Sequence, residues 1–129
     1  MNRNFLMLIL LIFLIGICAL EQISVSKALG TINSLAVQIQ TSVQNSTQIN
    51  TPNVQQQVEN LNSTWNHYEN ILCFFSNHKD MKEMGIEIQR MIIYSATNQH
   101  EEFKASLCLV ILYSETFDHF MGISFQNIF

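Results

Sequence analysis

Residues 54–75 read VQQQVENLNSTWNHYENILCFF, and the spacing of their apolar side chains decides the fold. Apolar residues recur at alternating steps of four and three positions: Val54, Val58, Leu61, Trp65, Tyr68, Leu72 and Phe75. This spacing places them along one face of an α-helix. Thr51 and Pro52 precede the stretch as a capping residue and a first helical residue. The stretch therefore predicts a helix that buries one face, with Trp65 in the core.

Three further stretches have helical periodicity. The one before it carries Val25, Leu29, Ile32, Ala36, Ile39 and Val43. The two after it carry Met81, Met84, Ile88, Met91 and Ile92, and then Phe103, Leu107, Val110, Phe117 and Met121. Ser76 and Asn77 separate the second stretch from the third, and Asn98 ends the third as a candidate cap of the fourth. One proline and four glycines in the chain disfavour an all-β protein, so we predict an all-α fold.

The amino terminus holds an apolar run from Phe5 to Leu20, preceded by Arg3. As a helix these 16 residues span about 24 Å, less than the ~30 Å hydrocarbon core of a bilayer, but the helix can continue past Glu21. A retained anchor and a cleaved signal peptide both have this shape. Signal peptidases prefer small residues before the cut, and Ile17 is bulky, so the sequence favours a retained anchor.

We therefore predict a membrane anchor at residues 1–22, which contacts lipid through residues 5–20, and an extracytoplasmic helical domain at residues 23–129. Arg3, the only charge before the run, orients the amino terminus toward the cytoplasm. Helices joined by short turns alternate in direction. The expected fold is a transmembrane helix that continues into an antiparallel bundle of about four helices. A homodimeric coiled coil through the first stripe is the alternative.

Composition and motifs exclude several functions. Charged residues make up 12% of the chain, the net charge is -4 and no basic block occurs, so we expect no nucleic-acid partner. No nucleophile–base pair, phosphate-binding loop or CxxC motif is present, and we expect neither catalysis nor a cofactor. Cys18 lies in the apolar run, while Cys73 and Cys108 are either free thiols or a disulfide between the second and fourth helices.

Alternating helices bring a polar group to the membrane-facing end of the bundle. It contains two histidines and four carboxylates: His78, His119, Asp80, Glu83, Glu115 and Asp118. Imidazole and carboxylate groups can bind zinc, but the spacing matches no tight ligand motif, so we assign no metal. The apolar carboxyl terminus would end at the same level, docked on the bundle, in the membrane interface or in a partner. The candidate interaction residues are His78, Asp80, His119, Asn127, Ile128 and Phe129.

Several short features together carry a resemblance that covers nearly the whole chain. They are Glu21-Gln22 after the apolar run, Trp65, the stretch ILCFF at 71–75 followed by Asn77-His78, and the ending ISFQNIF at 123–129. With these the chain resembles the clostridial membrane-anchored proteins classed as domain of unknown function four-three-six-three. The resemblance implies a small helical domain outside the cytoplasmic membrane of a spore-forming Gram-positive bacterium. It implies no activity, and it suggests a multi-span membrane protein as partner.

These observations predict a membrane-anchored, non-catalytic accessory or interaction subunit for another membrane protein. Two alternatives belong to other classes: a metal- or ligand-sensing bundle, and a four-helix factor secreted after signal cleavage. We predict that deletion of residues 127–129 abolishes partner capture and preserves helicity.

Overall fold

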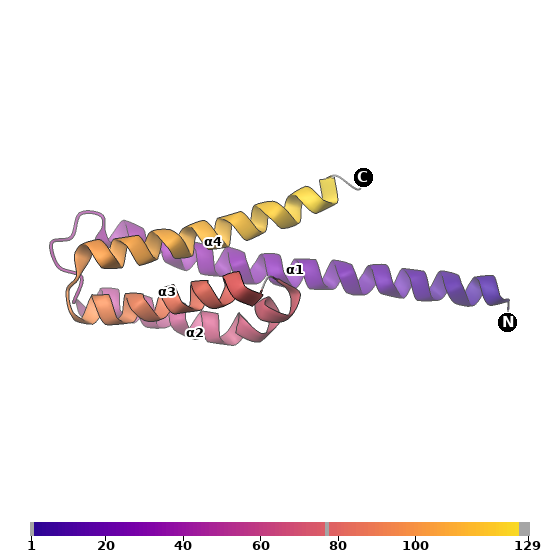
Figure 1. The fold of residues 1–129 in the computed structure, drawn as a ribbon, viewed down its shortest axis with the longest axis horizontal. Helices are drawn as coiled ribbons and strands as arrows, with labels where there is room; N and C mark the ends of the chain where they lie inside the picture. The colour runs from indigo at the N-terminus through magenta and orange to yellow at the C-terminus, as the bar shows by residue number, and fades with distance from the viewer. Residues whose placement is uncertain (1, 77, 127–129) are drawn as a thin grey trace.

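The computed structural model describes residues 2–76 and 78–126, and side chains up to residue 115. Four helices follow one another along the chain: α1 (Arg3–Val43), α2 (Pro52–Phe75), α3 (His78–Ala96) and α4 (His100–Gln126). They run alternately in opposite directions, and α1 extends far beyond the other three at its amino-terminal end (Figure 1). The all-α prediction and the four expected helices are confirmed.

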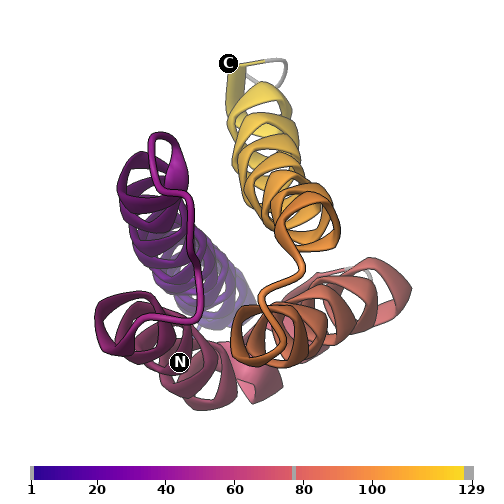
Figure 2. The same cartoon turned by 90° about the vertical axis from the view of Figure 1, so that its left-hand side faces the viewer.

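The four helices occupy the corners of a square when the bundle is viewed from its end (Figure 2). α1 packs against α2 and α4, and α3 packs against the same two helices. Among the described residues, helices on opposite corners do not contact each other. The arrangement is therefore an up-down-up-down bundle in which every helix packs against the two helices at the adjacent corners.

The core consists largely of the predicted stripes. All six apolar positions of the α1 stripe are buried, from Val25 to Val43. α2 and α4 cover this stripe within one chain, so the core forms without a coiled-coil partner. Whether the protein dimerises through another surface stays an open prediction.

α2 begins as the sequence predicts. The Thr51 side chain accepts a hydrogen bond from the Val54 backbone N–H, and Pro52 occupies the first turn. Trp65 is 3% exposed, as expected for a core residue. It lies directly against Gly85 of α3, where a side chain would meet the indole ring. The α2 stripe ends earlier than predicted, because Leu72 is its last buried residue and Phe75 is 37% exposed.

A polar contact joins the two connections at the end of the bundle far from the α1 extension. Asn98 adopts a left-handed backbone conformation with φ of 56°. Its side-chain Oδ1 accepts a hydrogen bond from the backbone N–H of Ile49 at 3.0 Å, and the Ile49 side chain is fully buried. The prediction that Asn98 caps α4 is therefore wrong: α4 begins at His100, and the Asn98 side chain instead secures the α1–α2 connection.

α4 confirms the core positions for which side chains are described. Phe103, Leu107 and Val110 are buried, and Ser114 is buried one turn farther along. Asn33 of α1 donates a 2.9 Å hydrogen bond from Nδ2 to Ser114 Oγ, which in turn donates to the Ile111 carbonyl. This contact fixes the relative register of α1 and α4. The side chains of Phe117 and Met121 lie outside the described part of the chain.

Candidate functional site

The amino-terminal part of α1 is apolar and uncovered. From Arg3 to Ser24 no side chain is buried, and the most apolar window of 18 residues makes no buried contact with the rest of the protein. Among the described residues, α1 is the one helix long and apolar enough to cross a membrane, by length and composition. A signal sequence at an amino terminus meets the same criteria. α1 continues past Glu21 without a break, so the uncovered segment from Arg3 to Ser24 spans about 33 Å.

α4 presents a second uncovered apolar surface, on the side opposite its core-facing residues. We call it the α4 stripe, and it consists of Ala105, Cys108, Leu109 and Leu112. All four are exposed, and Leu112 is 53% exposed. Each member lies three or four residues from two of the others, so they form one continuous strip along the helix. Residues 107–113 read LCLVILY and are apolar on every side of the helix, which favours cover on more than one side. The bundle covers only the side that faces the core.

The predicted interaction residues fall into two groups. His78 and Asp80 lie in the first turn of α3, at the end of the bundle from which α1 extends (Figure 1). His78 is exposed and Asp80 is half-buried. His119 belongs to the final turns of α4, and its side chain lies outside the described set. Residues Asn127, Ile128 and Phe129 also lie outside the described residues, so their part in binding stays a prediction.

Metal binding has no support from the side chains that the structure describes. Within that set, no group of three or more His, Cys, Asp and Glu residues comes together. Glu83 is half-buried in α3 and Glu115 is exposed on α4. The remaining predicted member, Asp118, lies beyond residue 115, where side chains are not described.

The three cysteines are free thiols. Cys73 and Cys108 belong to α2 and α4, which stand on opposite corners of the bundle, so the disulfide alternative is wrong. Cys108 is exposed, whereas Cys73 is half-buried. Burial raises the pKa of the Cys73 thiol, the Glu69 carboxylate raises it further and the Lys82 ammonium partly opposes this. Cys73 is therefore a poor nucleophile at neutral pH.

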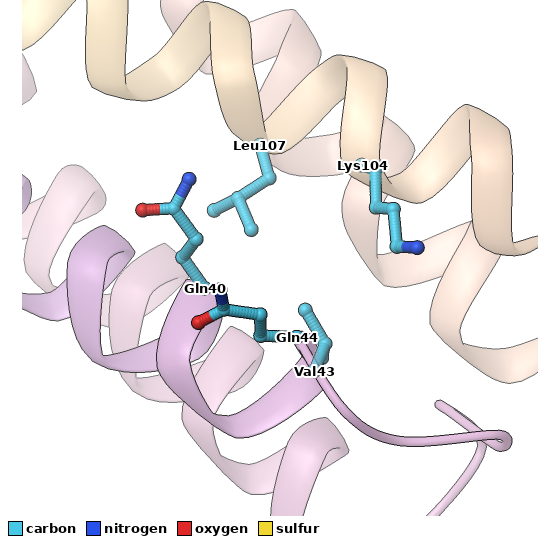
Figure 3. Close-up of a pocket in the computed structure, with 5 residues that line it drawn as sticks. All are labelled: Gln40, Val43, Gln44, Lys104 and Leu107. Atoms are coloured by element: carbon cyan, nitrogen blue, oxygen red, sulfur yellow. The ribbon is translucent and has the colours of Figure 1, made fainter.

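A groove of about 430 Å³ lies between α1 and α4 at the end far from the α1 extension (Figure 3). Gln40, Val43 and Gln44 line it from α1 and the connection that follows, and Lys104 and Leu107 line it from α4. The two amides and the ammonium group could bind a polar ligand. A smaller groove of about 210 Å³ between α2 and α3 has Val58, Glu59 and Ile92 in its wall.

Sequence reasoning missed one buried charge. Glu87 of α3 is 5% exposed, and its carboxylate forms a 2.6 Å ion pair with Arg90, which is half-exposed. The sequence does indicate this burial, because Glu87 lies three residues after Met84 and four before Met91, on the buried face of α3. A carboxylate at such a position needs a partner, and Arg90 one turn later provides it.

Comparison with known proteins places the chain in a family. Residues 20–128 match the family described as Domain of unknown function (DUF4363). The chain belongs to this family. The DUF4363 match starts at the end of the apolar run and covers all four bundle segments. No curated protein and no solved structure shows detectable similarity to the chain. The DUF4363 description assigns no activity.

Proposed function

We propose that the protein is a membrane-anchored, non-catalytic accessory subunit whose α4 stripe binds a multi-span membrane protein. In this proposal residues 3–24 cross the cytoplasmic membrane, the amino terminus faces the cytoplasm and the bundle lies outside. The single observation that carries the proposal is the α4 stripe. It is a continuous apolar strip that the protein's own core does not use.

The α4 stripe has the features of a surface that is buried in a protein contact. Monomeric proteins expose single apolar side chains freely, but a continuous strip of them marks an interaction surface. Ala105 and Cys108 are small, so another helix can approach α4 closely beside the larger Leu109 and Leu112. Glu101 and Glu102 in the first turn of α4 border the stripe and give it a polar edge, as at known protein interfaces.

The membrane anchor supports the choice of a membrane protein as partner. The 33 Å length of the uncovered segment matches a hydrocarbon core of about 30 Å. Anchoring also confines the bundle to a thin layer beside the bilayer, which raises its effective concentration toward proteins in the same membrane. A modest apolar surface can then suffice for a stable contact.

Site-specific photo-crosslinking in the native host tests the proposal. One full-length variant carries a photoreactive amino acid at Leu112, and a matched control carries it at Asn60, which is exposed on α2. We expect a single adduct of the Leu112 variant with a multi-span membrane protein, identified by mass spectrometry, and none at Asn60. Equal adducts at both positions, or an adduct of the chain with itself alone, would contradict the proposal.

A further inference from the structure

The carboxyl-terminal end of α2 carries a group of exposed apolar side chains, which we call the aromatic tip: Ile71, Phe74 and Phe75. Phe74 is 80% exposed, the highest value among the exposed large apolar side chains. The rings of Phe74 and Phe75 pack edge to face with centroids 4.7 Å apart. The two phenylalanines therefore pack as one apolar unit, from which Phe74 projects while Phe75 is 37% exposed.

The position of the aromatic tip relates it to the uncovered segment of α1. Leu72 is the last buried residue of α2, and Val25 is the first buried residue of α1. Because these helices are antiparallel neighbours, the core ends at both residues on the same side of the bundle (Figure 1). Phe74 and Phe75 come two and three residues after Leu72. The aromatic tip therefore lies beside the last turn of α1 before it enters the bundle.

This level coincides with the surface of a membrane spanned by α1. A hydrocarbon core of about 30 Å takes up about 20 residues of an upright helix. Counted from Phe5, just after the polar residues Arg3 and Asn4, such a span reaches Ser24, but the Glu21 carboxylate keeps the hydrocarbon boundary near Leu20, about one turn before the bundle begins at Val25. The aromatic tip is then at the boundary between acyl chains and head groups, where exposed phenylalanine side chains are stabilised.

We propose that the aromatic tip inserts into the outer interface of the bilayer and gives the bundle a second attachment beside α1. The inference rests on the proposed membrane span of α1. With α1 alone, the bundle could tilt freely on its anchor. With the tip inserted, the bundle axis stays close to the membrane normal, and the α4 stripe keeps a constant height above the membrane.

The charges around the tip indicate that apolar insertion, and not attraction to anionic lipid, is the main contribution. Lys79 and Lys82 follow the turn, but Asp80 and Glu83 accompany them in the same two turns of α3. Positive and negative groups are equal in number there, unlike the clusters of lysine and arginine that recognise anionic lipids. Insertion should therefore occur in vesicles of phosphatidylcholine alone.

Quenching of tryptophan fluorescence by brominated lipid tests the inference. The full-length chain is reconstituted in phosphatidylcholine vesicles whose acyl chains carry bromine near the glycerol end. Phe74→Trp places a reporter in the tip, and Ile93→Trp places a matched reporter on the exposed face of α3. Ile93 lies 15 residues after His78, about 22 Å along the helix from the turn. The unsubstituted chain, whose only tryptophan is the buried Trp65, provides the baseline.

We expect the quenching added by Phe74→Trp to be at least about twofold larger than that added by Ile93→Trp. Equal quenching of the two variants in vesicles that carry the protein would overturn the inference. Quenching that appears only after anionic lipid is added, or only at protein densities that favour pairs of chains, would also overturn it. Circular dichroism verifies that both variants keep the helical content of the parent.

The same samples separate this inference from the anchor proposal. If the chain fails to float with vesicles in a density gradient, the proposed membrane span is wrong. If the chain floats and Phe74→Trp is quenched no more than Ile93→Trp, the span stands and only the insertion of the aromatic tip is refuted.

Discussion

Replacement of Gly85 by alanine should destabilise the bundle through one identifiable contact. A Cβ atom at position 85 would lie 2.9 Å from Nε1 of Trp65 and 3.0 Å from Cε2 and Cζ2. Carbon atoms prefer separations of about 3.5–4.0 Å, so the indole ring must move by about 0.5 Å or more. Trp65 is buried between helices, and its ring is rigid. Forcing extra atoms into such a site typically costs about 1–3 kcal/mol.

The higher helix propensity of alanine stabilises the bundle and so opposes the steric clash. A second glycine-to-alanine substitution measures this propensity effect alone. Alanine is more favourable than glycine in a helix interior by about 1 kcal/mol. Gly30 lies on the exposed side of α1, and a Cβ atom there would meet nothing within 4 Å. Gly30→Ala should therefore raise the free energy of unfolding by about 1 kcal/mol. Gly85→Ala should lower it by about 1 kcal/mol, because the steric cost exceeds the propensity gain.

Urea-induced unfolding of the full-length chain in mild detergent measures both variants, with circular dichroism and Trp65 fluorescence as signals. The difference between the two variants, about 2 kcal/mol, isolates the steric term because the propensity gain is common to both. Adding Trp65→Phe to each variant provides a further check, with circular dichroism as the signal because Trp65 is the only tryptophan of the chain. The smaller ring should relieve the clash, so the two substitutions should be non-additive at position 85 and additive at position 30. Equal stabilisation by both alanines would refute the α2–α3 packing described above.

Three further substitutions or modifications have expected outcomes. Asn98→Ala should cost about 1 kcal/mol more in unfolding free energy than Asn98→Gly, because both lose the bond to Ile49 but only glycine adopts the left-handed conformation freely; equal costs would contradict this. Thr51→Ala should cost about 1 kcal/mol and Thr51→Ser much less, measured by the same unfolding assay, because serine keeps the cap; a cost for serine as large as for alanine would count against the cap. Cys73 in the folded chain should be alkylated by iodoacetamide more slowly at pH 8 than in the urea-unfolded chain, since its raised pKa reduces the thiolate fraction; a faster reaction in the folded state would refute the assigned environment.

Much of the fold follows from local periodicity. The α2 stripe runs at steps of four and three because a helix with one buried face requires it. The structure buries its members from Val54 to Leu72 except Tyr68, which is half-buried. Thr51 and Pro52 mark the start of α2 through interactions that lie within three residues of each other. Such short-range features can be predicted because the chemistry that determines them is adjacent in sequence.

The failures arise where the outcome depends on residues far away in the chain. Asn98 looked like a helix cap, but its side chain bonds Ile49, which lies 49 positions earlier. Phe75 continues the α2 stripe in sequence, yet it is 37% exposed because the core ends at Leu72, about one turn before it. Glu87 occupies a buried position that a search for apolar residues passes over. Periodicity states which face of a helix is apolar, but not where the neighbouring helices begin and end.

The candidate surfaces also combine features that the sequence predicts with features that depend on distant residues. The apolar run and the all-round apolar character of α4 are visible in sequence, but which face of α4 stays open depends on how α1 and α3 cover the other side. Likewise, alternation of helices correctly places His78 at the end from which α1 extends. The alternation of helices gives no indication that Phe74 is the most exposed large apolar side chain of the described residues. A single phenylalanine outside the buried stripe of α2 carries no periodic signal.

The central claim is that residues 3–24 remain in the bilayer while the bundle folds beside it. Intact-mass spectrometry of the chain recovered from native membranes after an alkaline wash tests it most directly. We predict that the washed membrane pellet retains the full 129-residue chain at its unprocessed mass of 14.9 kDa. Recovery in the soluble fraction, either of the intact chain or of a form shortened near Leu20, would contradict the account.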